Sequence, residues 1–121
     1  LGDVHASQGD TEFTGTAAET TATVRVRLEV VSGKRTPWMR IEKPQSLIAL
    51  FASRPLEVAV ETATTNLMEW LIQEYDITPT DAYCLVSTCP DFRIHVYQMC
   101  KIGKLAYVAG AEIPKRYLSS T

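Results

Sequence analysis

The chain has 121 residues, of which 45% are hydrophobic and 21% are charged, and its formal net charge is −2. This is the composition of an ordinary globular domain, and a domain of this length buries roughly two-thirds of the surface of its unfolded chain. The basic residues are scattered, so nothing resembles the positive stripe that tracks a phosphate backbone, and no apolar run approaches the ~20 residues that span a bilayer. We expect a single cytoplasmic domain over residues 1–121, with neither nucleic acid nor a membrane as partner.

The chain begins without a methionine and reaches a dense polar motif at once, so we interpret it as a piece of a longer polypeptide. Its cysteines, Cys84, Cys89 and Cys100, form an odd set without C-x-x-C spacing. This disfavours both a disulfide framework and a structural zinc knuckle. We expect buried free thiols.

The first half of the sequence is predicted to be rich in β-strands. Apolar and polar residues alternate over 21–31, which is typical of a half-buried strand. The apolar residues of this alternation are Val24, Val26, Leu28 and Val30. A turn is expected at 32–34, and two further strands are predicted over 38–42 and 46–52.

Two helices are predicted in the second half. From residue 56 apolar residues recur at steps of three and four, which indicates an amphipathic helix of about five turns. Its apolar positions are Leu56, Val60, Ala63, Leu67, Trp70 and Leu71. We expect Ser53 to be its N-cap and Pro55 to lie in its first turn. A second helix is predicted to begin after the capping residue Thr78, with Pro79 at its first position, and to end near Cys89.

Strand alternation resumes over 92–99, and a turn at 103–104 leads into a last strand over 105–109. A terminal helical turn is predicted over 114–118. The order of elements is β-β-β-β-α-α-β-β, which is typical of an α+β domain. We therefore predict an N-terminal half of antiparallel strands, followed by two helices and a terminal β-hairpin.

Residues of the types that commonly bind metals are concentrated near the N-terminus. Asp3 and His5 are two residues apart, and so are Asp10 and Glu12. On extended backbone each pair would point to one side, and Gln8 with the glycine after it would supply a bend that lets the pairs converge. Imidazole nitrogen and carboxylate oxygen suit a divalent cation such as zinc, and a spare carboxylate can act as general base on water.

The spacing also fits other interpretations. Acidic residues in glycine-containing segments are often solvated turns, and a D-x-H pattern alone is common. The pattern by itself therefore leaves open a catalytic metal site, a structural cation site and a solvated turn.

The string from Gly2 to Glu12, followed by a small-residue stretch that ends at Glu19, closely resembles the acetamidase/formamidase family, whose signature reads G-D-x-H-x-x-Q-G-D-G-E. Weaker similarities at 81–83 and 113–115 extend the resemblance over nearly all of the chain. The resemblance implies that these residues are the C-terminal portion of a larger acetamidase/formamidase-like protein.

The resemblance also implies an activity: hydrolysis of the C–N bond of short linear amides, such as formamide and acetamide, to carboxylate and ammonia with a metal-activated water. It implies that Asp3 and His5 are metal ligands and that Gln8 binds substrate. It also implies that the catalytic residues are Asp10, Glu12 and Glu19. We expect zinc as the metal and Glu12 as the general base, with Glu19 the alternative base. The expected partners are the small amide and either further copies of the chain, as a homo-oligomer, or the missing N-terminal half.

Thr11 departs from the family pattern, which has glycine between the two acids. A β-branched residue does not readily take a positive φ, so we expect either ordinary β backbone at Thr11 or an altered pocket. This departure favours the alternative of a non-catalytic α+β module, or an inactive fragment, with a structural cation site. His95 is interpreted as a surface or hydrogen-bonded histidine, because no acid is spaced in the sequence to join it.

Overall fold

The computed structural model describes residues 2–118. The strands are β1 (Val4–Ser7), β2 (Ala18–Thr20), β3 (Arg40–Glu42), β4 (Ser46–Ser53), β5 (Arg93–Gln98) and β6 (Tyr107–Pro114). The helices are α1 (Leu56–Glu74) and α2 (Pro79–Thr88), and the single 3-10 turns are η1 (Asp10–Glu12) and η2 (Lys115–Tyr117). The predicted α+β class, with antiparallel strands, two helices and a terminal hairpin, is confirmed.

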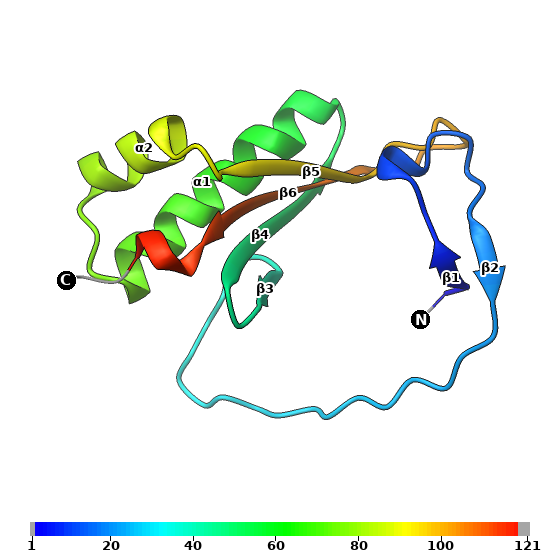
Figure 1. Cartoon of the computed structure of the whole chain (residues 1–121), viewed down its shortest axis with the longest axis horizontal. Coiled ribbons are helices and arrows are strands. Elements are labelled where there is room, and N and C mark those ends of the chain that lie inside the picture. The colour runs from blue at the N-terminus through cyan, green and yellow to red at the C-terminus, as the bar shows by residue number, and fades with distance from the viewer. Residues whose placement is uncertain (1, 119–121) are drawn as a thin grey trace.

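Four strands form the main sheet in the order β3-β4-β6-β5, and every neighbouring pair is antiparallel. Strands β1 and β2 form a separate two-stranded ribbon. Figure 1 shows α1 lying along the main sheet and the ribbon standing beyond the far end of β5 and β6. The ribbon, which carries His5 and Glu19 of the N-terminal motif, therefore lies at the edge of the molecule and not over its core.

The core lies between α1 and one face of the main sheet. Alternate residues of a strand point to opposite faces, so one set of β4 and β6 side chains meets the apolar side of the helix. The buried residues of this core are Leu47, Ala49, Ala63, Leu67, Trp70, Leu71, Ala111, Ile113 and Leu118. Arg40 extends from β3 over the ring of Trp70, with 4.7 Å between its guanidinium carbon and the ring centroid.

On the face of the main sheet that points away from α1, polar side chains surround apolar ones. A Cβ atom added to Gly110 on β6 would lie 2.7 Å from Cε2 of Tyr97 and 3.1 Å from Cγ2 of Ile48. Glycine at this position therefore lets the Tyr97 ring lie across β6. His95, two residues before Tyr97, stacks on that ring at 5.6 Å between centroids.

The helix predictions are confirmed, with one correction at the start of α1. Pro55 occupies the N-cap position of α1, whereas Ser53, the predicted cap, is the last residue of β4. The side chain of Thr78 caps α2 as predicted, because its hydroxyl oxygen accepts a hydrogen bond from the backbone N–H of Asp81 at 3.1 Å. Pro79 is the first residue of α2, where its missing N–H removes no helical hydrogen bond.

The prediction of a strand over 21–31 is wrong, because no strand is present between β2 and β3 in the part of the chain that the structure describes. The apolar residues of the alternation are exposed: Val24 58%, Val26 64%, Leu28 90% and Val30 98%. Figure 1 shows this stretch as a long arc outside the main body. The sequence pattern is that of a strand, but strand pairing requires a neighbouring strand, and within residues 2–118 this stretch has none.

The remaining strands are close to their predicted positions. The last strand begins at Tyr107 and runs on to Pro114, five residues past its predicted end at 109, because it pairs with β4 over that whole length. The terminal helical turn is confirmed as η2. The cysteines are free, but only Cys100 is buried, and the prediction of burial is wrong for the exposed Cys84. No helix formed by residues 2–118 is both long and apolar enough to cross a membrane.

Candidate functional site

The ribbon brings two residues of the motif together. His5 on β1 and Glu19 on β2 are direct cross-strand partners, and such partners have Cβ atoms about 4.5–5.5 Å apart on one face of a ribbon. Asp3 lies just before β1, two residues from His5, and is exposed. His5 is half-buried, whereas Glu19 is exposed.

Gln8 connects His5 to the main sheet. Its side-chain Nε2 donates a hydrogen bond to the backbone carbonyl of Tyr97 on β5 at 2.9 Å, and its Oε1 lies 2.7 Å from Nδ1 of His5. A carbonyl oxygen can only accept, so the amide nitrogen must face Tyr97 and the amide oxygen must face His5. It follows that Nδ1 of His5 carries the proton.

This tautomer has a chemical consequence. When Nδ1 of a neutral imidazole is protonated, Nε2 holds the lone pair. Histidines that bind metals usually donate their other ring N–H to an oxygen acceptor, which fixes the ring and its tautomer. His5 therefore has the hydrogen-bond arrangement of a metal ligand, with Gln8 as the residue that positions it.

The second acidic pair of the motif is not extended. Asp10 to Glu12 form η1, with φ of 75° at Thr11 and 44° at Glu12. The prediction that Asp10 and Glu12 point to one side of an extended strand is therefore wrong. The alternative of ordinary β backbone at Thr11 is wrong as well, since Thr11 takes the positive φ that glycine adopts more readily.

The η1 turn is held in place by backbone hydrogen bonds. The N–H of Glu12 donates to the carbonyl of Gly9 at 3.2 Å, and the N–H of Gly15 donates to the carbonyl of Glu12 at 2.8 Å. The N–H of Met99, just beyond β5, donates to the carbonyl of Thr11 at 2.7 Å. These bonds fix η1 against the end of the main sheet despite the unfavourable φ at Thr11.

The motif does not form a complete metal site within residues 2–118, where no three His, Cys, Asp or Glu side chains are grouped so that they could hold an ion. Asp10 is near Tyr97, whose hydroxyl has a pKa raised first by burial and then by the charges of Glu112 and Asp10. The roles of Asp3, Asp10 and Glu12 stay predictions.

A second polar cluster, which sequence reasoning missed, surrounds Glu112 on the open face of the main sheet. One carboxylate oxygen accepts hydrogen bonds from Oγ of Ser46 at 2.5 Å and from Nζ of Lys43 at 3.3 Å. The other lies 2.5 Å from Nε2 of His95. The prediction of a hydrogen-bonded His95 is confirmed, but the expectation that no acid could join it is wrong. Extending the terminal hairpin to Pro114 would have placed Glu112 beside β5 and revealed the contact.

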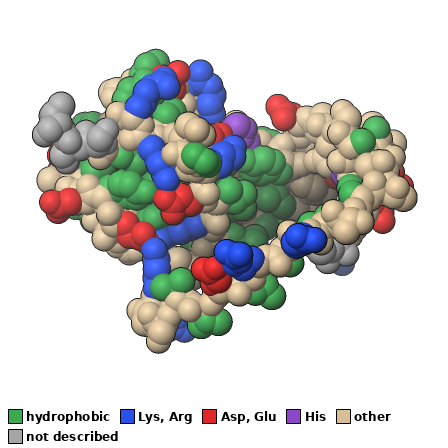
Figure 2. Space-filling model, turned by 60° about the horizontal axis from the view of Figure 1, so that its bottom comes forward, with side chains coloured by type: hydrophobic (Ala, Val, Ile, Leu, Met, Phe, Trp, Pro, Cys, Tyr) green, Lys and Arg blue, Asp and Glu red, His purple; other side chains and the backbone are tan. Residues whose placement is uncertain are grey.

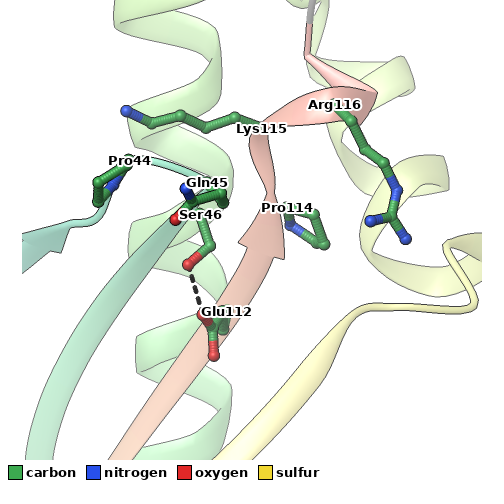
Figure 3. A pocket seen from close by; sticks show the side chains of 7 residues that line it. All are labelled: Pro44, Gln45, Ser46, Glu112, Pro114, Lys115 and Arg116. Carbon is green, nitrogen blue, oxygen red and sulfur yellow. Dashed lines mark hydrogen bonds between the residues drawn. The ribbon is translucent and has the colours of Figure 1, made fainter.

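A cavity of about 520 Å³ adjoins Glu112 (Figure 3). Its lining residues are Pro44, Gln45, Ser46, Glu112, Pro114, Lys115 and Arg116. The two cations in the lining are already paired, Lys115 with Glu42 at 2.6 Å and Arg116 with Asp91 at 2.5 Å. The cavity lies at the Pro114 end of β6, whereas the N-terminal motif contacts β5 near Tyr97. It is therefore separate from the motif.

The hydrogen bonds to Glu112 affect its ionisation. Burial, the largest single influence, raises the pKa of this carboxyl, but the hydrogen bonds from Ser46, His95 and Lys43 together outweigh it and hold the pKa below the ordinary value of 4.5. A lowered folded-state pKa stabilises the fold at pH values above the unfolded pKa, and this contribution is lost as the pH falls through the folded pKa.

We therefore expect Glu112→Gln to destabilise the protein near neutral pH and to lose much of that effect in acid. The measurement is urea unfolding of both proteins at pH 7 and at pH values below 4.5, where the difference in free energy of unfolding should shrink. Glu61→Gln, an exposed acid on α1, is the matched control and should show little difference at either pH. A difference for Glu112→Gln that is independent of pH would contradict the assignment.

Thr11→Gly should stabilise the protein. A left-handed backbone costs an L-residue about 1–2 kcal/mol, whereas glycine adds about 0.5–1 kcal/mol of unfolded-state entropy, so we expect a net gain of roughly 0.5–1 kcal/mol in the free energy of unfolding. Thr14→Gly, in the same turn region but without a positive φ, should destabilise by a similar amount. Equal destabilisation by both substitutions in urea unfolding would show that Thr11 is not strained.

Two solved acetamidases are similar to this chain in structure. No family model matches the chain, and no curated protein sequence matches it. An acetamidase from Yersinia enterocolitica has a TM-score of 0.85 and 29% sequence identity, covering 96% of this chain and 34% of that one. An acetamidase from Bacillus halodurans has a TM-score of 0.79 and 20% identity, covering 96% of this chain and 39% of that one.

This chain spans little more than a third of the length of the solved acetamidases that it matches. Within that span it shares their arrangement of strands and helices almost throughout, and it carries the G-D-x-H-x-x-Q-G-D signature ahead of Thr11. The chain therefore resembles the acetamidase/formamidase family in its motif and is similar to two solved acetamidases in its fold.

Proposed function

We propose that this chain supplies part of the active site of an amidase that hydrolyses short linear amides, such as formamide or acetamide, to carboxylate and ammonia. The observation that carries the proposal is the pair of hydrogen bonds by which Gln8 holds His5 against β5 with its Nε2 available. The similarity to two proteins named as acetamidases supports the class of reaction.

The donors near His5 fit a divalent cation such as zinc. An oriented imidazole with carboxylates beside it is a usual donor set for this ion. In the proposal His5 and Asp3 are the ligands from this chain, and the rest of the coordination comes from residues beyond these 121, since catalytic zinc has three protein ligands as a rule. Bound there, the ion would polarise the amide carbonyl and lower the pKa of water.

Glu12 is the proposed general base. Its carboxylate would take a proton from the attacking water and return it to the departing nitrogen. The hydrogen bonds that fix η1 from both sides support this role, because a base must be held in position to be effective. Asp10, in the same turn, would add negative charge beside Glu12. Glu19, opposite His5, is the alternative base.

Gln8 has a positioning role in this proposal and does not bind substrate directly. The resemblance implies a substrate-binding residue, but both ends of the Gln8 amide are already engaged, one with His5 and the other with Tyr97. A substrate as small as formamide offers little binding energy of its own, so accurate placement of the reacting groups must supply much of the rate.

The test is ammonia release from formamide and acetamide by the protein that contains this chain. We expect chelation to abolish activity, zinc to restore it, and Glu12→Gln to lower kcat by about 10²-fold or more without loss of bound metal. Glu61→Gln is the control for removal of an exposed acid far from the motif and should retain activity. Activity that survives both chelation and Glu12→Gln would refute the mechanism.

The second candidate function is a non-catalytic module with a structural cation site. The positive φ at Thr11 favours it, because the turn that carries the proposed base is less favourable with threonine than with glycine. A structural cation predicts a lower Tm after chelation in a protein that releases no ammonia. An unchanged Tm after removal of metal would exclude this alternative.

A further inference from the structure

One loop connects the core of the molecule to the N-terminal motif. We call residues 99–106, which join β5 to β6, the β5–β6 loop. Figure 2 shows the part that carries β1, β2 and η1 as a smaller mass beside the main body, with a hollow that contains hydrophobic side chains between the two. The motif meets the main body at the end of β5 and at this loop, through Gln8 and through the bond between Met99 and Thr11.

On the motif side, the β5–β6 loop packs against Gly15, whose N–H donates to the carbonyl of Glu12 at 2.8 Å. A Cβ atom added to Gly15 would lie 2.6 Å from Cδ1 of Ile102 and 2.9 Å from Sγ of Cys100. Cys100 is buried, and its Sγ accepts a hydrogen bond from the N–H of Ile102 at 3.4 Å. The loop and the turn that carries Glu12 are therefore in close contact, so a displacement of one also displaces the other.

On the core side, Arg54 holds the same loop from its position between β4 and α1. Its Nε donates to the carbonyl of Leu105 at 2.5 Å, and its Nη2 donates to the carbonyl of Gly103 at 3.4 Å. Its guanidinium carbon lies 4.6 Å from the centroid of the Tyr107 ring on β6. A guanidinium presents several donors in one rigid plane, so a single arginine can hold two carbonyl groups at once. Arg54 therefore ties the loop to the central strands of the main sheet.

We propose that Arg54 is a positioning residue for Glu12, the proposed general base. Its hydrogen bonds fix the β5–β6 loop, and the loop fixes η1 through Gly15 and through the bond between Met99 and Thr11. Arg54 itself contacts neither metal nor substrate in this proposal. The inference rests on the function proposed above, and it adds a residue that lies outside the N-terminal signature.

The kinetics of amide hydrolysis by the protein that contains this chain separate positioning from stability. Arg54→Leu should lower kcat for formamide at least tenfold, because a displacement of about 1 Å at a reacting group can cost about 10²-fold in rate. Bound zinc and KM should be unchanged, since their contacts are not altered. Arg54→Lys keeps the charge and a donor, so it should recover part of the lost rate. A purely structural role would lower Tm and leave kcat per folded molecule at the wild-type value.

Arg93→Leu is the matched control for Arg54→Leu. Arg93 also donates to two backbone carbonyls, those of Pro90 at 2.7 Å and Phe92 at 2.9 Å, but it lies at the opposite end of β5 from the motif. Its loss removes the same type of side chain and the same kind of hydrogen bond. The variant should therefore retain the wild-type kcat.

A double-mutant cycle shows whether Arg54 acts through Glu12. In the Glu12→Gln background the proposed base is already absent, so Arg54→Leu should lower the remaining kcat by less than about twofold. If the two effects multiplied in full, Arg54 would act on some other group, and the proposal would be wrong.

Hydrogen exchange followed by mass spectrometry tests the same contacts without any activity. In Arg54→Leu, the peptide that contains residues 9–15 should exchange its backbone hydrogens faster than in the wild type, because the turn loses its support. Gly15→Ala should have the same effect from the motif side, since its Cβ would collide with the loop. Gly33→Ala is its control: Gly33 has a similar φ of 76°, but no atom of the described residues lies within 4 Å of an added Cβ.

Two further results would overturn the proposal. One is a wild-type kcat per folded molecule in Arg54→Leu, and the other is unchanged exchange of residues 9–15 in that variant. A wild-type protein that releases no ammonia would instead refute the proposed function and, with it, the role of Glu12 as base. The exchange of residues 9–15 would then still decide whether Arg54 holds the turn.

Discussion

Strands β4 and β6 pair along their whole length, from Ser46 opposite Pro114 to Ser53 opposite Tyr107, and this ladder places every other part of the molecule. One face of it forms the core with α1, and β3 and β5 add to its two edges. Strand β5 and the residue just beyond it in turn provide the two backbone groups, the carbonyl of Tyr97 and the N–H of Met99, that hold the N-terminal motif. The motif is therefore positioned by a sheet whose central strands lie far from it in sequence.

Few hydrophobic contacts fix the motif, since most of its side chains are exposed. Its position depends instead on the hydrogen bond of Gln8 to Tyr97 and on the bond between Met99 and Thr11. Such a site is less stable than the core and can more readily rearrange when a metal or another chain is added. The solved acetamidases that it matches are much longer than this chain, and among residues 2–118 no three His, Cys, Asp or Glu side chains are grouped so that they could hold an ion.

Local patterns in the sequence were sufficient for the helices, whose periodicity and Thr78 cap do not depend on distant residues. They could not predict the strand order, because pairing of β4 with β6 brings together residues separated by two helices and β5. The same limit explains the error over 21–31, where a strand pattern is present and a partner strand is absent from the described chain. The signature pointed to His5 and Gln8, which contact each other in the structure, and their roles stay predictions. The partner of His95 required the register of Glu112 on β6, and the φ of Thr11 was the opposite of what its side chain favours.

The central claim is that Gln8 holds His5 with its proton on Nδ1. Two-bond proton–nitrogen correlation spectra of the ¹⁵N-histidine-labelled protein near pH 8 test it directly, because the chain has only two histidines. The account predicts opposite tautomers: His5 protonated on Nδ1, facing Gln8, and His95 protonated on Nε2, facing Glu112. Gln8→Ala should remove the preference at His5 and leave His95 unchanged. A wild-type His5 protonated on Nε2 would contradict the account.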